Sequence, residues 1–211
     1  MKFKLLGWPE IAEKNMTHSN IYPFKTRPYA HQRKAWELSR EKDEFALFMD
    51  MGTGKSKVII DTIAWLYDKG RIDSALIVAP KGVYQNWIRN EIPTHLPDHI
   101  VTQQAAWYSS PKKDQEKAIQ NILTPTHDLR IFVMNVEAFS TSKGVKFAES
   151  FMRCAGKCMM IVDESTTIKS PKASRTKSII RIGIQAKYRR ILTGEPVTRS
   201  PLDLYPQFQF L

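Results

Sequence analysis

A glycine-rich loop joins a short apolar run to an amphipathic segment near residue 50. The run covers residues 45–49, and Gly52-Thr53-Gly54-Lys55-Ser56 leads into residues 56–67, whose apolar side chains recur at helical spacing. Two glycines let the backbone curl so that successive N–H groups converge, and a helix start adds free N–H groups of its own. The pattern predicts a phosphate site built from Met51 and the five residues after it, with Lys55 at the β- and γ-phosphates and the Ser56 hydroxyl on Mg²⁺.

Four further apolar runs follow, and helical segments separate them. The runs cover residues 75–79, 131–134, 159–162 and 188–192, and the helical segments cover residues 85–92, 111–123 and 172–184, with another at 33–40. Short runs that are apolar almost throughout are typical of parallel strands covered on both faces. The alternation predicts an α/β domain with a central, mainly parallel sheet flanked by helices, and ligands in such sheets bind at the carboxyl ends of the strands.

Two adjacent acids stand at the end of the run at 159–162. Asp163 at the end of a buried strand is suited to hold the Mg²⁺ that accompanies the phosphates. The neighbouring Glu164 is suited to orient the attacking water. An Asp-Glu pair in this place is also common as a helix N-cap, so the metal assignment depends on the phosphate loop being present as well.

The charge of the chain favours a polyanionic partner. The net charge is +11, and residues 142–199 hold thirteen Lys and Arg against four acids. Nucleic acid and an anionic membrane surface both fit this excess, and a basic protein without either partner stays open. No run reaches the roughly 18 apolar residues of a membrane span, and no signal sequence is evident. With two cysteines, Cys154 and Cys158, expected to be buried free thiols, we expect an intracellular protein of the cytoplasm, nucleoid or nucleus, not a secreted one.

Three motifs together resemble one family, the Swi/Snf-type double-stranded DNA translocases among the superfamily 2 helicases. The family patterns are Glu-Met-Gly-x-Gly-Lys-Thr, Asp-Glu-x-His and Leu-Thr-Gly-Thr-Pro. This chain has Asp50-Met51-Gly52-Thr53-Gly54-Lys55-Ser56, Asp163-Glu164-Ser165-Thr166 and Leu192-Thr193-Gly194-Glu195-Pro196. Thr166 stands where the family has His, Glu195 where it has Thr, and Met49 where the strict phosphate-loop pattern has Gly.

The resemblance covers nearly all of residues 20–211 and implies a fold and a set of roles. The fold is the first RecA-like lobe of a helicase, here residues 1–211 with 1–24 as an extension, and the second lobe, in cis or in trans, is expected outside this sequence. ATP and Mg²⁺ are the implied cofactors, with Lys55 and Glu164 catalytic. Gln32 would recognise the adenine edge. Contacts to nucleic acid would come from Pro80, Lys81, Asn135 and Lys169, and coupling between the two sites from Thr193 and Gly194.

Three other functions stay open on the sequence. An RNA helicase lobe has similar motifs, although the stretch that contains Lys169 resembles the DNA branch. A nucleotide-dependent module that binds nucleic acid without turnover needs no second lobe. A phosphate-loop kinase of small molecules is a minor alternative, because it does not explain residues 192–196.

Overall fold

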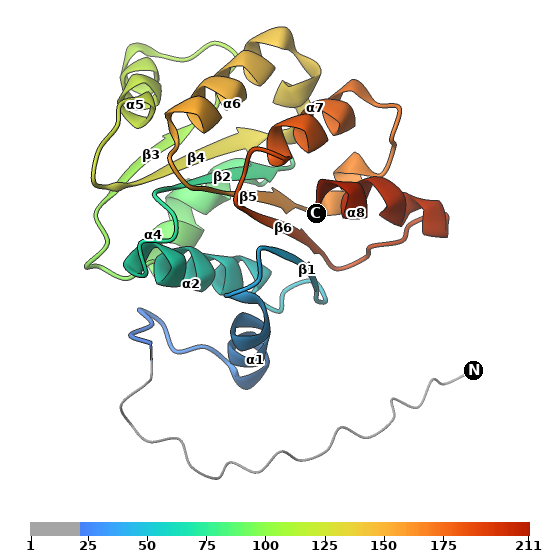
Figure 1. Cartoon of the computed structure of the whole chain (residues 1–211), viewed down its shortest axis with the longest axis horizontal. Coiled ribbons are helices and arrows are strands. Elements are labelled where there is room, and N and C mark those ends of the chain that lie inside the picture. The colour runs from blue at the N-terminus through green and yellow to red at the C-terminus, as the bar shows by residue number, and fades with distance from the viewer. Residues whose placement is uncertain (1–21) are drawn as a thin grey trace.

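A six-stranded parallel sheet forms the centre of the computed structural model, which describes residues 22–211 (Figure 1). The strand order is β1-β6-β5-β2-β4-β3, and every pair of neighbours is parallel. Most of the expected extension at 1–24 lies outside the described residues. The strands are β1 Glu44–Phe48, β2 Ser74–Ala79, β3 Thr102–Ala106, β4 Leu129–Asn135, β5 Cys158–Asp163 and β6 Tyr188–Thr193.

Helices cover both faces of the sheet. The α-helices are α1 Ala30–Ser39, α2 Lys55–Asp68, α3 Tyr84–Asn86, α4 Ile92–His95, α5 Lys113–Leu123, α6 Ser142–Cys154, α7 Ser174–Gly183 and α8 Tyr205–Phe210. A π-helix, η2 Trp87–Glu91, joins α3 to α4, and the 3₁₀ segments are η3 Val136–Ser140, η4 Ser165–Ile168 and η5 Pro201–Leu204. Figure 1 shows α1, α2 and α4 on one face and α5, α6 and α7 on the other.

The sheet divides the hydrophobic core into two layers. One layer gathers buried residues of α2 with side chains of β2 and β4, such as Ile59, Ile63 and Ile77. The other packs α5, α6 and α7 on the opposite face, around residues such as Phe132 and Phe151. Strand β2 is buried along its whole length because both layers cover it, which explains its apolar run from Ala75 to Ala79. The predicted α/β class with a central parallel sheet is therefore confirmed.

Five strands and five helical segments lie within a few residues of their predicted places, but strand β3 and helix α6 were not predicted. Strand β3 lies at the edge of the sheet, and its first three residues are only half-buried, so its sequence is polar. Helix α6 has three basic residues and a glycine, which obscure the helical spacing of its buried apolar residues Ala148, Phe151 and Met152. No helix in residues 22–211 is long and apolar enough to cross a membrane.

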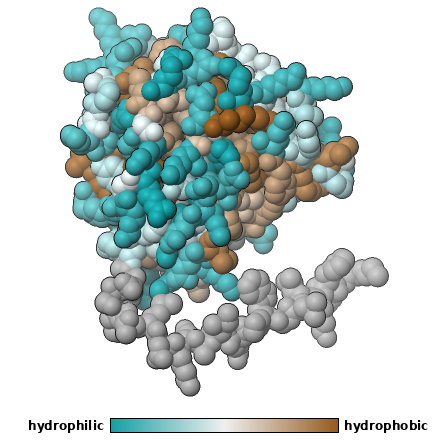
Figure 2. All heavy atoms as spheres, viewed as in Figure 1, coloured by the Kyte–Doolittle hydropathy of each residue, from teal (hydrophilic) through white to brown (hydrophobic). Residues whose placement is uncertain are grey.

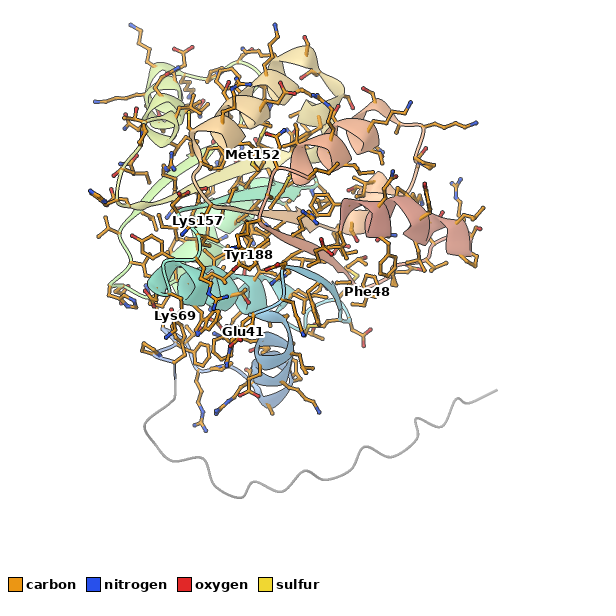
Figure 3. The ribbon with its side chains drawn as sticks, viewed as in Figure 1. Glu41, Phe48, Lys69, Met152, Lys157 and Tyr188 are labelled. Carbon is orange, nitrogen blue, oxygen red and sulfur yellow. The ribbon has the colours of Figure 1, made fainter. Side chains whose placement is uncertain are left out.

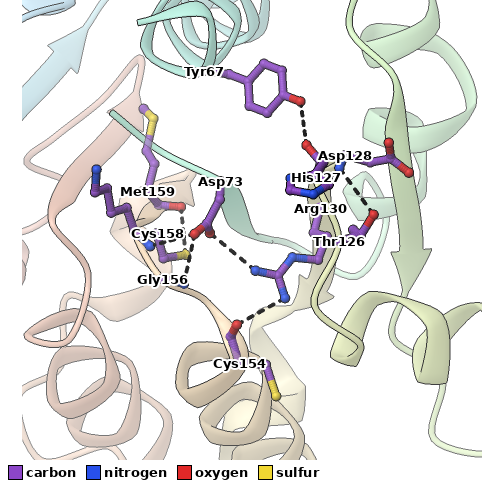
Figure 4. A network of polar contacts seen from close by, with 11 residues as sticks. Tyr67, Asp73, Thr126, His127, Asp128, Arg130, Cys154, Gly156, Cys158 and Met159 are labelled. Carbon is purple, nitrogen blue, oxygen red and sulfur yellow. Dashed lines mark hydrogen bonds and ion pairs between the residues drawn. The ribbon is translucent and has the colours of Figure 1, made fainter. Parts of the chain in front are cut away.

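At the amino ends of the central strands, one carboxylate joins three segments (Figure 4). Asp73 accepts hydrogen bonds from the N–H groups of Gly156 and Lys157, each at 3.0 Å, and pairs with the Arg130 guanidinium at 3.4 Å. Both cysteines nearby are free thiols, as predicted. Cys158 is buried, and burial raises the pKa of its thiol to about 12, whereas Cys154 is only half-buried, so its predicted burial is wrong.

One residue of the basic stretch at 142–199 points inward instead of adding to the surface charge. The Arg190 guanidinium is fully buried and donates to the backbone carbonyls of Ser39, Lys42 and Asp43. Burial lowers its pKa to about 10. Arg190 therefore ties β6 to the end of α1, so this one of the thirteen Lys and Arg at 142–199 cannot contact the polyanionic partner that the net charge favours.

Candidate nucleotide-binding site

Three predicted motifs meet at the carboxyl edge of the sheet because their strands are neighbours. Strand β6 lies between β1 and β5, and Phe48 is in register with Thr193 while Asp163 is in register with Leu192. The phosphate loop follows β1, the acidic pair ends β5, and Gly194 follows β6. The topology therefore brings together segments that lie more than a hundred residues apart in the chain.

The loop after β1 has the curled backbone that the two glycines predicted. Gly52 and Gly54 have φ of 75° and 82°, in the left-handed region that favours glycine. Helix α2 begins directly after Gly54, at Lys55. The Lys55 side chain is only 8% exposed, and its ammonium donates to the carbonyls of Met49 at 2.9 Å and Asp50 at 3.2 Å. The lysine is thus folded back into the curl of the loop beside the first N–H groups of the helix.

Gln32 on α1 lies against this loop. Its amide nitrogen donates to the Thr53 carbonyl at 3.0 Å, and its amide oxygen accepts from the Tyr29 N–H at 2.9 Å. A Cβ at Gly54 would meet the end of the flexible Gln32 side chain and displace it, while the positive φ is what requires glycine there. An amide has two donor hydrogens and two acceptor lone pairs, so Gln32 keeps one of each for a ligand.

The two acids after β5 are held differently. Asp163 accepts from the Trp87 indole N–H at 3.0 Å and from the Glu164 backbone N–H at 3.0 Å. Burial raises the pKa of Asp163 to about 6, and the charge of Lys55 opposes that rise. Glu164 has φ of 47°, and within residues 22–211 it is the one residue other than glycine with a positive φ. Such backbone conformations are costly and gather at functional sites.

The end of β6 touches both the loop and the acidic pair. The hydroxyl of Thr193, which is buried, donates to the Glu164 carboxylate at 3.4 Å. A Cβ on Gly194 would lie 3.2 Å from the backbone nitrogen of Met51, so the two segments pass at close range. The end of β6 therefore lies directly beside both the phosphate loop and the acidic pair.

Oxygen ligands suitable for Mg²⁺ are present, but not as a complete cage. Within the described part of the chain, no three His, Cys, Asp or Glu side chains lie close enough together to hold a metal. Asp163 provides a carboxylate and Ser56 a hydroxyl at the first turn of α2. Mg²⁺ is commonly held by one or two such protein ligands together with substrate phosphates, so this donor set fits it.

The SNF2-related domain model matches residues 29–211. The chain belongs to this family. A probable ATP-dependent DNA helicase, CHR12 of Arabidopsis thaliana, is 29% identical over 163 residues, which is 77% of this chain and 14% of that protein. A second relative is the SWI/SNF-related matrix-associated actin-dependent regulator of chromatin subfamily A containing DEAD/H box 1A of Danio rerio. It is 27% identical over 207 residues, which is 97% of this chain and 20% of that protein. The chain thus spans a fifth or less of these curated relatives.

Solved structures show the same fold. The SWI2/SNF2 ATPase core of Sulfolobus solfataricus, solved with double-stranded DNA, superposes with a TM-score of 0.68 at 21% identity, covering 90% of this chain and 36% of that one. The UvsW helicase of bacteriophage T4 superposes with a TM-score of 0.60 at 14% identity, covering 86% of this chain and 57% of that one. The SNF2-related domain therefore has the RecA-like architecture that the resemblance implied.

The predicted nucleic-acid contacts of this SNF2-related domain fall in two places. Pro80 and Lys81 follow β2 and Asn135 ends β4; because Ala79 is in register with Asn135, these three lie at one edge. The Asn135 side chain is already engaged, since its oxygen accepts from the Ala138 N–H at 2.8 Å and caps η3. Lys169, after η4, donates to the Thr198 hydroxyl at 2.6 Å and so belongs with the loop that follows β6.

One residue at the site of this SNF2-related domain could not be assigned from the sequence. Trp87 lies in the predicted helical segment at 85–92 and is buried in the core. Its hydrogen bond to Asp163 was not predicted, because the two residues lie 76 positions apart and no spacing rule relates them. A tryptophan at helical spacing gives the same sequence signal whether or not its N–H is used.

Proposed function

We propose that this SNF2-related domain binds Mg·ATP in the loop after β1 and serves as the first RecA-like lobe of an ATP-dependent translocase on double-stranded DNA. The observation that supports the proposal best is the charge arrangement. The buried Lys55 ammonium lies in the curl of the loop, and the Asp163 carboxylate ends β5, two strands away at the same edge of the sheet. A cation beside a helix start, with a carboxylate at the same edge, suits a metal-bound triphosphate.

Each side chain of the site has a role in this proposal. Lys55 and the N–H groups around Gly54 bind the β- and γ-phosphates, and Gln32 recognises the adenine edge. Ser56 and Asp163 would hold Mg²⁺, which neutralises phosphate charge when bound. Glu164, fixed by the Thr193 hydroxyl, orients the attacking water.

Titration of the 211-residue chain with ATP in the presence of Mg²⁺ tests this proposal, with binding followed by calorimetry. We expect one saturable site per chain, and weaker binding of GTP because its base presents a different pattern of donors and acceptors to Gln32. An absence of saturable heat with either nucleotide would contradict the nucleotide site.

Double-stranded DNA is the proposed track, and the proposed place of action is the cytoplasm, nucleoid or nucleus. The SWI2/SNF2 core with a similar fold was solved with double-stranded DNA, and the Arabidopsis relative is described as a probable DNA helicase. Lys81 is exposed at the edge where the nucleotide site also lies. The face seen in Figure 2 is mainly hydrophilic, with smaller apolar patches. A second RecA-like lobe, in cis or in trans, would complete the DNA track.

Binding to duplex DNA is expected to be dominated by phosphate contacts and to weaken steeply as salt is raised. Each phosphate neutralised contributes about −0.9 to the log–log slope of affinity against salt concentration. We expect Lys81→Ala to make that slope shallower by about one and to weaken binding uniformly across sequences. Fluorescence anisotropy with two unrelated duplexes checks this, with Lys69→Ala at the other end of the sheet as a matched control. A salt-independent affinity, or tighter binding to single-stranded RNA than to duplex DNA, would contradict it.

A further inference from the structure

Trp87 is a buried residue whose polar atom points at the acidic pair. It begins the π-helix η2 in the middle of the helical stretch from Tyr84 to His95. The side chain is 2% exposed and packs in the core layer that contains α2. Its indole N–H donates to the Asp163 carboxylate at 3.0 Å. A hydrogen bond to a charged acceptor is roughly twice as strong as one between neutral groups.

The carboxylate of Asp163 is held at both oxygens. One oxygen accepts from Trp87 and the other from the Glu164 N–H. The second bond comes from the backbone of the next residue, so it limits rotation of the Asp163 side chain but does not link Asp163 to another helix or strand. Trp87 supplies the link to a separate helix. The π-helix that contains Trp87 agrees with a functional role, because π-helical turns are rare and are found frequently at functional sites.

Trp36 shows that an indole N–H in this fold is not always used. It is buried in the same core layer, and within the described residues its N–H has no hydrogen-bond partner. The two tryptophans therefore share burial and differ in the hydrogen bond. This difference separates the effect of the Trp87 N–H from the effect of burying a large ring.

The helix that contains Trp87 starts at the loop after β2. The Pro80 carbonyl accepts from the N–H groups of Val83 and Tyr84, each at 3.0 Å, which fixes the loop to the first turn. Lys81 lies in that loop. Trp87 lies three positions after Tyr84, so less than one turn of helix connects the loop to the indole.

We propose that Trp87 is a positioning residue, whose indole N–H holds the Asp163 carboxylate in the orientation that Mg·ATP requires and joins it to the helix that begins at the loop at 80–83. This inference rests on the proposed nucleotide site. The indole touches neither phosphate nor metal in this arrangement; it acts through Asp163. Loss of the N–H leaves the phosphate loop intact and affects only the contribution of the metal to binding.

The test is the Mg²⁺ requirement for binding a fluorescent ATP analogue by the 211-residue chain carrying Trp87→Phe. Binding in EDTA is expected to change less than about twofold, since the phosphate loop is unaltered. The gain in affinity on adding Mg²⁺ is expected to fall by about tenfold, the loss that follows removal of one hydrogen bond to a charged group. Trp36→Phe is the matched control and is expected to leave the Mg²⁺ gain unchanged.

A second variant removes the N–H without changing the size of the ring. Benzothienylalanine at position 87 has sulfur in place of the indole nitrogen, and we expect it to reproduce the loss seen with Trp87→Phe at an unchanged melting temperature. A wild-type Mg²⁺ gain in that variant would overturn this inference and leave the proposed function standing. Failure of the wild-type chain to bind the analogue at all would overturn the proposed function, and this inference with it.

Discussion

Lys55→Ala is expected to weaken binding of Mg·ATP by more than about a hundredfold. The Lys55 ammonium is the cation held inside the phosphate loop, where it donates to the carbonyls of Met49 and Asp50. In Lys55→Ala, a bound triphosphate would lose its principal protein counter-charge. Each charge-assisted contact from the ammonium to a phosphate oxygen contributes about 1.5–3 kcal/mol. Two such contacts amount to more than a hundredfold in affinity. Calorimetric titration of both proteins under the same conditions measures the difference.

The control for this prediction is the lysine that caps the other end of the same helix. Lys69 follows α2 at its far end, and Figure 3 shows it well separated from Phe48, which ends β1 just before the phosphate loop. Lys69→Ala is expected to bind Mg·ATP with wild-type affinity. Circular dichroism and thermal unfolding should show that Lys55→Ala still folds, because α2 keeps its buried apolar stripe. Unchanged nucleotide affinity in a folded Lys55→Ala chain would contradict the role of the loop.

The parts of the fold that could be predicted from the sequence are those in which local pattern and burial coincide. Strand β2 is apolar from Ala75 to Ala79 and β5 from Cys158 to Val162 because both lie in the middle of the sheet. The phosphate loop has a glycine at each position that needs a positive φ. The order of the motifs along the chain, combined with parallel pairing, was sufficient to place them at one edge of the sheet.

The parts that could not be predicted depend on contacts between distant segments. Arg190 looks like one more member of a basic stretch, yet it is buried against the end of α1 because three backbone carbonyls there accept its N–H groups. Trp87 packs like any core tryptophan, and only the three-dimensional structure shows its bond to Asp163. The edge strand β3 is exposed enough to be polar, so it lacks the apolar run that identifies the other strands.

The isolated 211-residue chain is expected to hold Mg·ATP but to hydrolyse it very slowly. Lys55 provides a counter-charge for the phosphates, and Glu164 orients the attacking water. Additional charge develops on the transferred phosphoryl group in the transition state. In related reactions an arginine from a facing domain stabilises that charge and contributes about 10³–10⁵ in rate. Arg189 and Arg190 on β6 are committed to Glu44 and to backbone carbonyls. We propose that a second RecA-like lobe supplies the missing cation, and that turnover by this chain alone stays at about 10⁻² s⁻¹ or below, against an ordinary value of about 10 s⁻¹.

Whether this chain is one lobe of a two-lobed motor is tested by steady-state phosphate release from the 211-residue chain saturated with Mg·ATP, measured with and without duplex DNA and with Glu164→Gln as the blank. We expect that nucleotide is bound, that phosphate release stays within a few-fold of the Glu164→Gln blank, and that duplex DNA does not raise it. Rapid DNA-stimulated release that disappears in Glu164→Gln would show that the chain is catalytically complete, and would contradict its assignment as one lobe of a two-lobed motor.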